Sequence, residues 1–217
     1  MNVHSYVDIF MCASSCKDKH EAIQSATLKL LAEKGFHGFS IKQVATEAGV
    51  AAGTIYLYFK DKDALISDLH FMIVESVAQA TFIDHDSSLP IRQQYQKICA
   101  NIWQHCLSNE AMTLCKAQFD HLPVDILQTA YSNLWGNQFL PLAKLYEQGR
   151  QQGLFKPLPN DVLCSFSLEP IINLAGQQII GLINITDNQL KSIFNASWEA
   201  ISISSDNLTQ EVTHDTH

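Results

Sequence analysis

Cysteine and histidine are the side chains in this sequence that could bind a metal or act as nucleophiles. Six cysteines and nine histidines occur, but only Cys99, His105 and Cys106 form a local cluster. Cys99 and Cys106 would share one helix face, and they offer too few ligands for a closed zinc site. We therefore predict no metal site and structural cysteines. Redox sensing by Cys99, Cys106 or Cys115 is the alternative, and it would require a lowered thiol pKa.

Sequence signatures of catalysis and of cofactor binding are missing. No GxGxxG, P-loop, HExxH or GxSxG pattern occurs, although these motifs carry dinucleotide, phosphate, zinc or acyl-transfer chemistry. The sequence therefore predicts a protein without a cofactor and without catalytic residues. An all-α enzyme is the alternative, and Glu169 or His105 would then be its acid or base.

The most informative pattern lies at Ile41–Tyr58, which reads IKQVATEAGVAAGTIYLY. Ala45 is small enough for a second helix to pack closely, and Gly49 falls where a tight turn often needs a positive φ. Ile55 then returns from the second helix to the core. This spacing is typical of a helix-turn-helix. An ordinary helical hairpin in another α protein is the alternative.

Helical spacing extends along the rest of the chain, which predicts an all-α fold. Ile23, Ala26 and Leu30, for example, fall on one helix face. We expect helices over residues 17–34, 41–48, 52–59, 61–82, 91–107, 109–119, 124–152, 161–183 and 187–203. Pro141 should kink the 124–152 helix, and Pro170 should bend the 161–183 helix.

Elements and charge together divide the chain. We expect a disordered extension at 1–16, a three-helix helix-turn-helix domain at 17–64, a helical bundle at 65–203 and a polar tail at 204–217.

The net charge is −8, and residues 1–70 hold seven Lys against eight Asp and Glu (net −1). Residues 71–217 hold seven Lys and Arg against fourteen Asp and Glu (net −7). An acidic rear half repels DNA and would orient the front half toward it.

Targeting and membrane segments are not apparent. The most apolar run, Ile171–Ile183, is interrupted by Asn173 and by two glutamines, and it is too short to cross a membrane. The first residues lack the positive charge of a secretory signal, and the cysteines form no disulfide framework. The sequence therefore predicts a cytoplasmic protein with no membrane partner.

The stretch Glu21–Leu69 closely resembles the N-terminal domain of TetR/AcrR-family regulators. The matching segments are EKGF (Glu33–Phe36), FSIKQVATEAGV (Phe39–Val50) and GTIYLYFKDKDAL (Gly53–Leu65). The resemblance implies a dimeric, DNA-binding transcriptional regulator. It also implies that the rear bundle binds a small molecule and forms the dimer.

The resemblance implies that the second helix of the motif lies in the major groove, with its first residues near the base edges. The residues expected there are Ala51, Ala52, Gly53, Thr54 and Tyr56. Those expected at phosphates are Ser40, Lys42, Tyr58 and Lys62. Each of the phosphate residues has a structural alternative, such as a helix cap for Ser40 or a solvated side chain for Lys62. The front half has no arginine, so bidentate readout of guanine is not expected, whereas the alanines could contact thymine methyl groups.

The rear bundle is rich in large apolar side chains with interleaved polar groups, as a pocket for a small apolar or aromatic ligand requires. The apolar candidates are Trp103, Met112, Phe119, Tyr131, Trp135, Phe139 and Phe166. The polar candidates are His105, Asn133, Gln138 and Glu169. Glu169 stands out because it follows an apolar stretch and precedes Pro170, and a buried carboxylate needs a partner. An ordinary helical core is the alternative for most of the aromatic residues.

The last two helices are expected to form the dimer, because small residues such as Ala175 and Gly176 allow close helix approach. Two-fold symmetry would match a palindromic operator. The resulting hypothesis is a repressor that leaves DNA when a ligand binds. The ligand would shift the population toward a conformation that does not bind DNA, and the 61–82 helix would be the part that moves. A ligand-binding protein with a vestigial head and a transcriptional activator are the alternatives.

Overall fold

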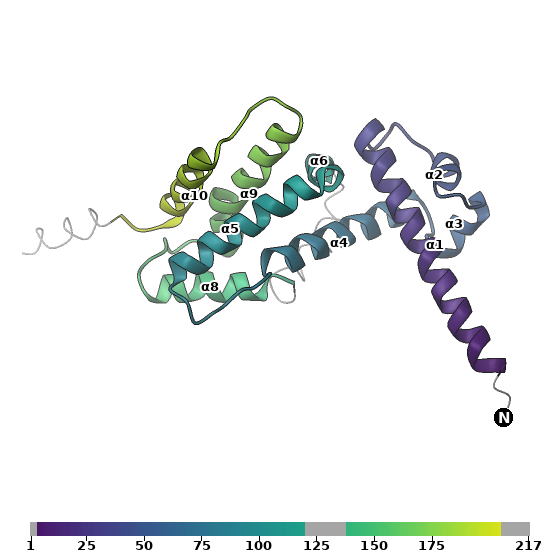
Figure 1. Ribbon diagram of the computed structural model, residues 1–217, viewed down its shortest axis with the longest axis horizontal. Coiled ribbons are helices and arrows are strands. Elements are labelled where there is room, and N and C mark those ends of the chain that lie inside the picture. Colours follow the sequence, from purple (N-terminus) through teal and green to yellow (C-terminus); the bar gives the residue numbers. More distant parts are fainter. Residues whose placement is uncertain (1–3, 120–137, 205–217) are drawn as a thin grey trace, which may run out of the picture. The chain divides into compact units, whose positions relative to one another are not determined.

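The computed structural model describes residues 4–119 and 138–204 (Figure 1). In these two stretches the regular elements are all helices, as the sequence predicts, and a single β-bridge joins Phe155 to Ser202. The helices are α1 (His4–Lys34), α2 (Ile41–Glu47), α3 (Ala52–Tyr58), α4 (Lys62–Thr81), α5 (Ile91–Ser108), α6 (Glu110–Phe119), α8 (Leu140–Gln151), α9 (Asn160–Ile179) and α10 (Asp187–Ile201).

Three helix boundaries differ from the prediction. α1 begins at His4 and so includes much of the segment for which we expected disorder, because no glycine or proline interrupts the chain before Lys34. α8 begins at Leu140, which places Pro141 in its first turn, where the missing N–H costs nothing. Pro141 therefore lies at the start of α8, and residues 124–137 of that predicted helix lie outside the described residues. α9 ends at Ile179 because Gly181 follows with a φ of 75°, the conformation of a helix C-terminus.

The chain forms two compact units. The first contains the chain up to Val74 and the end of α6 from Leu114, and the second contains Glu75–Thr113 and the chain from α8 onward. α4 and α6 are thus continuous helices that contribute to both units.

The core of the first unit is formed by α1, α2, α3 and the start of α4. The predicted apolar stripe of α1 is buried at Ile23, Ala26 and Leu30. The end of α6 also belongs here, since Gln118 Nε2 donates to the carbonyl oxygen of Leu31 at 3.0 Å. α2 contacts both α1 and α3 in this core, and these contacts hold the helix-turn-helix in place.

The core of the second unit is a helical bundle in which α9 packs against both α5 and α10. Two hydroxyl pairs cross this core: Tyr95 Oη lies 2.8 Å from Ser197 Oγ, and Tyr146 Oη lies 3.1 Å from Ser167 Oγ. All four side chains are buried. Because buried polar groups need partners, these pairs favour one arrangement of α5, α8, α9 and α10.

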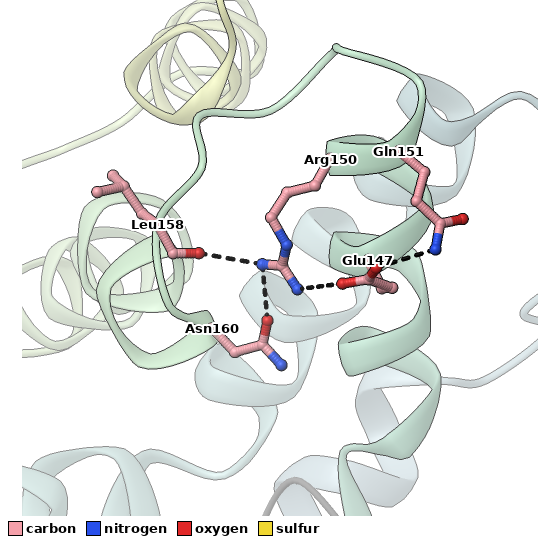
Figure 2. Close-up of polar contacts among 5 residues, drawn as sticks. All are labelled: Glu147, Arg150, Gln151, Leu158 and Asn160. Atoms are coloured by element: carbon pink, nitrogen blue, oxygen red, sulfur yellow. Dashed lines mark hydrogen bonds and ion pairs between the residues drawn. The ribbon is translucent and has the colours of Figure 1, made fainter.

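The segment between α8 and α9 is held in place by contacts at two points. Figure 2 shows Arg150 of α8, whose Nη1 donates to the Leu158 carbonyl at 3.1 Å and to Asn160 Oδ1 at 2.9 Å. Its Nη2 contacts Glu147 Oε2 at 2.9 Å. Earlier in the segment, Phe155 is buried against Trp198 of α10, with ring centroids 5.0 Å apart. The connection therefore holds α8, α9 and α10 together.

Candidate nucleic-acid interface and ligand-binding residues

The first helix of the predicted motif is capped at its start. Ser40 and Gln43 form a reciprocal capping box, in which the Ser40 N–H donates to Gln43 Oε1 at 2.9 Å and the Gln43 N–H donates to Ser40 Oγ at 3.4 Å. Such a box satisfies two backbone donors that the first turn would otherwise leave free. Ser40 therefore caps α2, the structural alternative named for it above, and its hydroxyl oxygen already accepts a hydrogen bond within the motif.

The turn between α2 and α3 has the predicted geometry. Gly49 has a φ of 68°, in the region that glycine adopts at little cost. The Val50 N–H donates back to the Ala45 carbonyl at 2.9 Å, which closes the end of α2. Ala45 and Ile55 are buried between the two helices. Residues 41–58 therefore form a helix-turn-helix.

α3 presents its outer face to solvent. Ala51, Ala52 and Gly53 are exposed at its start, and Tyr56 is 58% exposed. Leu57 is 83% exposed, the most of the exposed large hydrophobic residues in the described part of the chain. Sequence reasoning missed this residue, although its position opposite Ile55 on the helix could have indicated it.

The other predicted DNA-binding residues differ in their surroundings. Thr54 is half-buried and Lys42 is exposed. Tyr58 is half-buried, and its ring lies 6.0 Å from the ring of His20 of α1. Lys42 is therefore free to reach a phosphate, whereas Tyr58 also contributes to packing.

Lys62 is engaged inside the first unit. Its Nζ donates to the Phe36 carbonyl at 2.6 Å and to the Phe39 carbonyl at 2.8 Å, and it lies 4.0 Å from the centroid of the Phe39 ring. Burial lowers the pKa of this ammonium. Lys62 therefore joins α4 to the α1–α2 connection, a role that the sequence did not reveal.

Two family models match the chain: "Bacterial regulatory proteins, tetR family" over residues 23–69 and "Tetracyclin repressor-like, C-terminal domain" over residues 90–202. The chain belongs to the TetR family. An HTH-type transcriptional regulator from Haemophilus influenzae is 32% identical over 186 residues, covering 85% of this chain and 96% of that protein.

Two further relatives extend the comparison. The solved structure of a TetR-family protein from Vibrio parahaemolyticus matches with a TM-score of 0.75 and 33% identity, covering 86% of this chain and 100% of that one. The class D tetracycline repressor from Escherichia coli is 33% identical over 97 residues, covering 45% of this chain and 38% of that protein. The TetR-family chain is thus a transcriptional regulator with a DNA-binding helix-turn-helix. In its described residues no helix combines the length and apolarity needed to cross a membrane.

The predicted ligand-binding residues of the TetR-family chain do not all lie together. Trp103 is buried in the core of the second unit, and Phe139 packs against that core with its ring 6.1 Å from Phe82. Phe119 instead lies in the first unit, stacked on His70 with ring centroids 4.8 Å apart. Its placement indicates a core role in that unit. Tyr131 and Trp135, together with Asn133, lie outside the described residues.

Three other predicted residues are less enclosed than expected. Phe166 is 56% exposed on α9. Met112 and Glu169 are half-buried. Glu169 is therefore only partly enclosed, and its role in ligand binding stays a prediction.

His105 has the most unusual environment of the predicted polar residues. Its Nδ1 lies 3.3 Å from the Asn109 side-chain nitrogen, whose N–H donates to it, so that the neutral ring carries its proton on Nε2. Nε2 is buried, and no described residue offers it a hydrogen bond. Burial also lowers the pKa of the ring. His105 is thus a neutral donor with an unmet hydrogen bond.

The cysteines of the described residues provide little support for redox sensing. Burial raises the pKa of Cys99 and of Cys115 to about 12, so both thiols are protonated and weakly nucleophilic at neutral pH. Within the described ranges no group of three or more His, Cys, Asp or Glu side chains is placed to hold a metal ion.

Proposed function

We propose that this TetR-family regulator is a cytoplasmic, homodimeric repressor that binds a palindromic operator and is released by a small apolar or aromatic ligand. In this proposal residues 17–64 bind DNA, and residues 65–203 bind the ligand and form the dimer. The observation that carries it is the capped helix-turn-helix with the outer face of α3 exposed. The partial similarity to the class D tetracycline repressor supports repression.

The dimer in this proposal forms through α9 and α10. Phe166 of α9 is 56% exposed, and Ile180 and Leu182, which follow α9, are 57% and 71% exposed. Large apolar side chains exposed in this way are common at protein interfaces. A second copy would bury them and would present two recognition helices to successive turns of the groove.

The ligand in this proposal contacts the second unit. His105 offers a buried donor that has no partner among the described residues, and such an unmet donor destabilises the ligand-free state. A ligand with an acceptor oxygen would satisfy it, while Trp103 and Phe139 supply apolar contacts. α4 contributes to both units, so a ligand that favours another position of α4 would shift the population away from DNA binding.

Selection of binding sites from random duplex DNA, at near-physiological salt, tests the proposal. The expected result is an enriched palindrome with two half-sites, bound by a dimer as measured by light scattering with the DNA present. A folded dimer that enriches no sequence would overturn DNA recognition and favour a ligand-binding protein with a vestigial head. Enrichment of a single half-site by a monomer would overturn the dimeric arrangement.

A further inference from the structure

The recognition helix has an unusual chemical composition. α3 reads AGTIYLY, and it contains no charged side chain and no side-chain amide. The standard hydrogen-bonded pairings with bases use Arg or Lys with guanine, Asn or Gln with adenine, and Asp or Glu with cytosine. None of these is available on α3, whose polar side chains carry only the hydroxyl groups of Thr54, Tyr56 and Tyr58. Apolar contacts are the other means by which the helix can distinguish base pairs.

The outer face of α3 carries an exposed leucine beside the exposed ring of Tyr56. Ile55 is fully buried and fixes the inner face, whereas Leu57 is 83% exposed. Gly53 precedes Leu57 by four residues and therefore lies on the same face. Helical side chains lean toward the N-terminus, so Leu57 extends over the turn of Gly53. A Cβ at Gly53 would meet no atom within 4 Å, which leaves this turn open to an approaching partner.

Ala51 and Ala52 extend the apolar surface to the start of the helix, where both are exposed. With Leu57 they make up what we call the apolar recognition face. A single exposed leucine is ordinary on a protein surface. Here it lies on the second helix of a helix-turn-helix, where the partner is the major groove.

We propose that the apolar recognition face, with Leu57 at its centre, identifies thymines by their 5-methyl groups. The thymine methyl is the apolar feature that the major groove presents, and burying it against a leucine or alanine side chain is favourable. The bases facing α3 are then predominantly T·A or A·T pairs. This inference rests on the proposed function, because it specifies the sequence that the regulator binds.

Deoxyuridine substitution tests the inference directly. Deoxyuridine has the hydrogen-bonding groups of thymidine and lacks only the methyl group, so each thymine of the selected operator is replaced in turn. We expect an affinity loss of about fourfold for each contacted methyl group, at symmetric positions of both half-sites. If every single substitution leaves the affinity unchanged, methyl readout is overturned, and A·T preference through groove shape is the explanation.

The variant Leu57→Ala identifies the contacting side chain. The exposed site predicts an unchanged thermal midpoint, so folding does not confound the measurement. We expect this variant to lose the deoxyuridine effect at one thymine of each half-site and to keep it at the others, a coupling that a double-mutant cycle measures. The matched control Lys42→Ala, also exposed, should weaken binding at every sequence equally. If Leu57→Ala still loses affinity on deoxyuridine substitution at every thymine where the wild-type protein does, the role of Leu57 is overturned.

The outcomes separate the inference from the proposed function. Failure of the wild-type protein to enrich any sequence contradicts the regulator itself. An enriched operator whose half-sites are rich in G·C pairs at the positions facing α3 leaves the regulator intact and overturns methyl readout.

Discussion

The ammonium of Lys62 donates a hydrogen bond to the carbonyl oxygen of Phe39 at 2.8 Å while lying over the ring of the same residue. Phe39 immediately precedes Ser40, the cap of α2. The first residue of α4 is therefore attached to the residue that precedes the N-cap of α2. A shift of α4 would be transmitted to α2 through this contact.

The variant Lys62→Met tests whether this lysine positions the motif or contacts a phosphate. It leaves the Phe36 and Phe39 carbonyls without their donor, which should lower the free energy of unfolding by about 1–3 kcal/mol. DNA affinity should fall as well, with an unchanged dependence on salt. If Lys62 contacted a phosphate, the variant would instead reduce the slope of log affinity against log salt concentration by about one. The matched control is Lys60→Met, an exposed neighbour that should leave thermal stability intact.

The variant Gly53→Ala should have opposite effects on stability and on binding. Its Cβ meets no atom of the chain within 4 Å, and alanine favours a helix over glycine by about 0.5–1 kcal/mol. We therefore expect a higher unfolding midpoint by calorimetry. We also expect weaker operator binding in a titration, because the methyl group would stand between the helix and the base edges. Unchanged affinity would mean that the α3 backbone stays away from the bases.

Helix caps and turns were the most predictable parts of the site. Ser40 and Gly49 are local signals, since a cap needs only a neighbouring donor and a tight turn needs only a permissive residue. The two partners of Lys62 lie 26 and 23 residues away in sequence, and both are backbone carbonyls. Any residue has such a carbonyl, so no pattern of side chains could predict this contact.

Helix ends and unit membership were less predictable for a related reason. Pro141 fits either a kinked helix or a first turn, and only tertiary packing decides between them. Phe119 would be apolar and helical either as a ligand-pocket residue or as a core residue. In the structure it packs on His70 in the first unit. Sequence spacing identifies a buried face but not which neighbour covers it.

The variant His105→Leu should make folding less sensitive to acid. Burial lowers the His105 pKa in the folded protein below the ordinary histidine value of about 6.5, so the unfolded chain binds a proton first as the pH falls. The wild-type protein therefore loses stability from about pH 6.5 downward, until the folded-state pKa is reached. Denaturant unfolding at pH 7.5 and pH 5.5 should show a smaller difference for the variant.

The same variant should be at least as stable as the wild-type protein at pH 7.5, because it removes a buried donor for which the described part of the chain supplies no partner. His37→Gln is the control, since His37 is exposed and should leave the pH dependence unchanged. A marked loss of stability in His105→Leu at pH 7.5 would mean that Nε2 has a partner in solution.

The variant Gly149→Ala should destabilise the second unit. A Cβ at this position would lie 2.0 Å from Cδ2 of Phe155, which is itself buried. Such overpacking typically costs about 1–3 kcal/mol. The double variant Gly149→Ala/Phe155→Leu should recover part of the loss in chemical denaturation, because the ring is then absent. Equal losses in the single and double variants would place the strain elsewhere.

A recognition helix without charged side chains has a consequence for how the regulator searches a genome. Attraction to any stretch of DNA depends on lysine and arginine contacts with phosphates, and residues 1–70 hold seven lysines against eight acidic residues. We therefore expect few copies to be held on random chromosomal sites and short residence on each. Most copies would stay free in the cell, and occupancy of the operator would respond quickly to a change in their number.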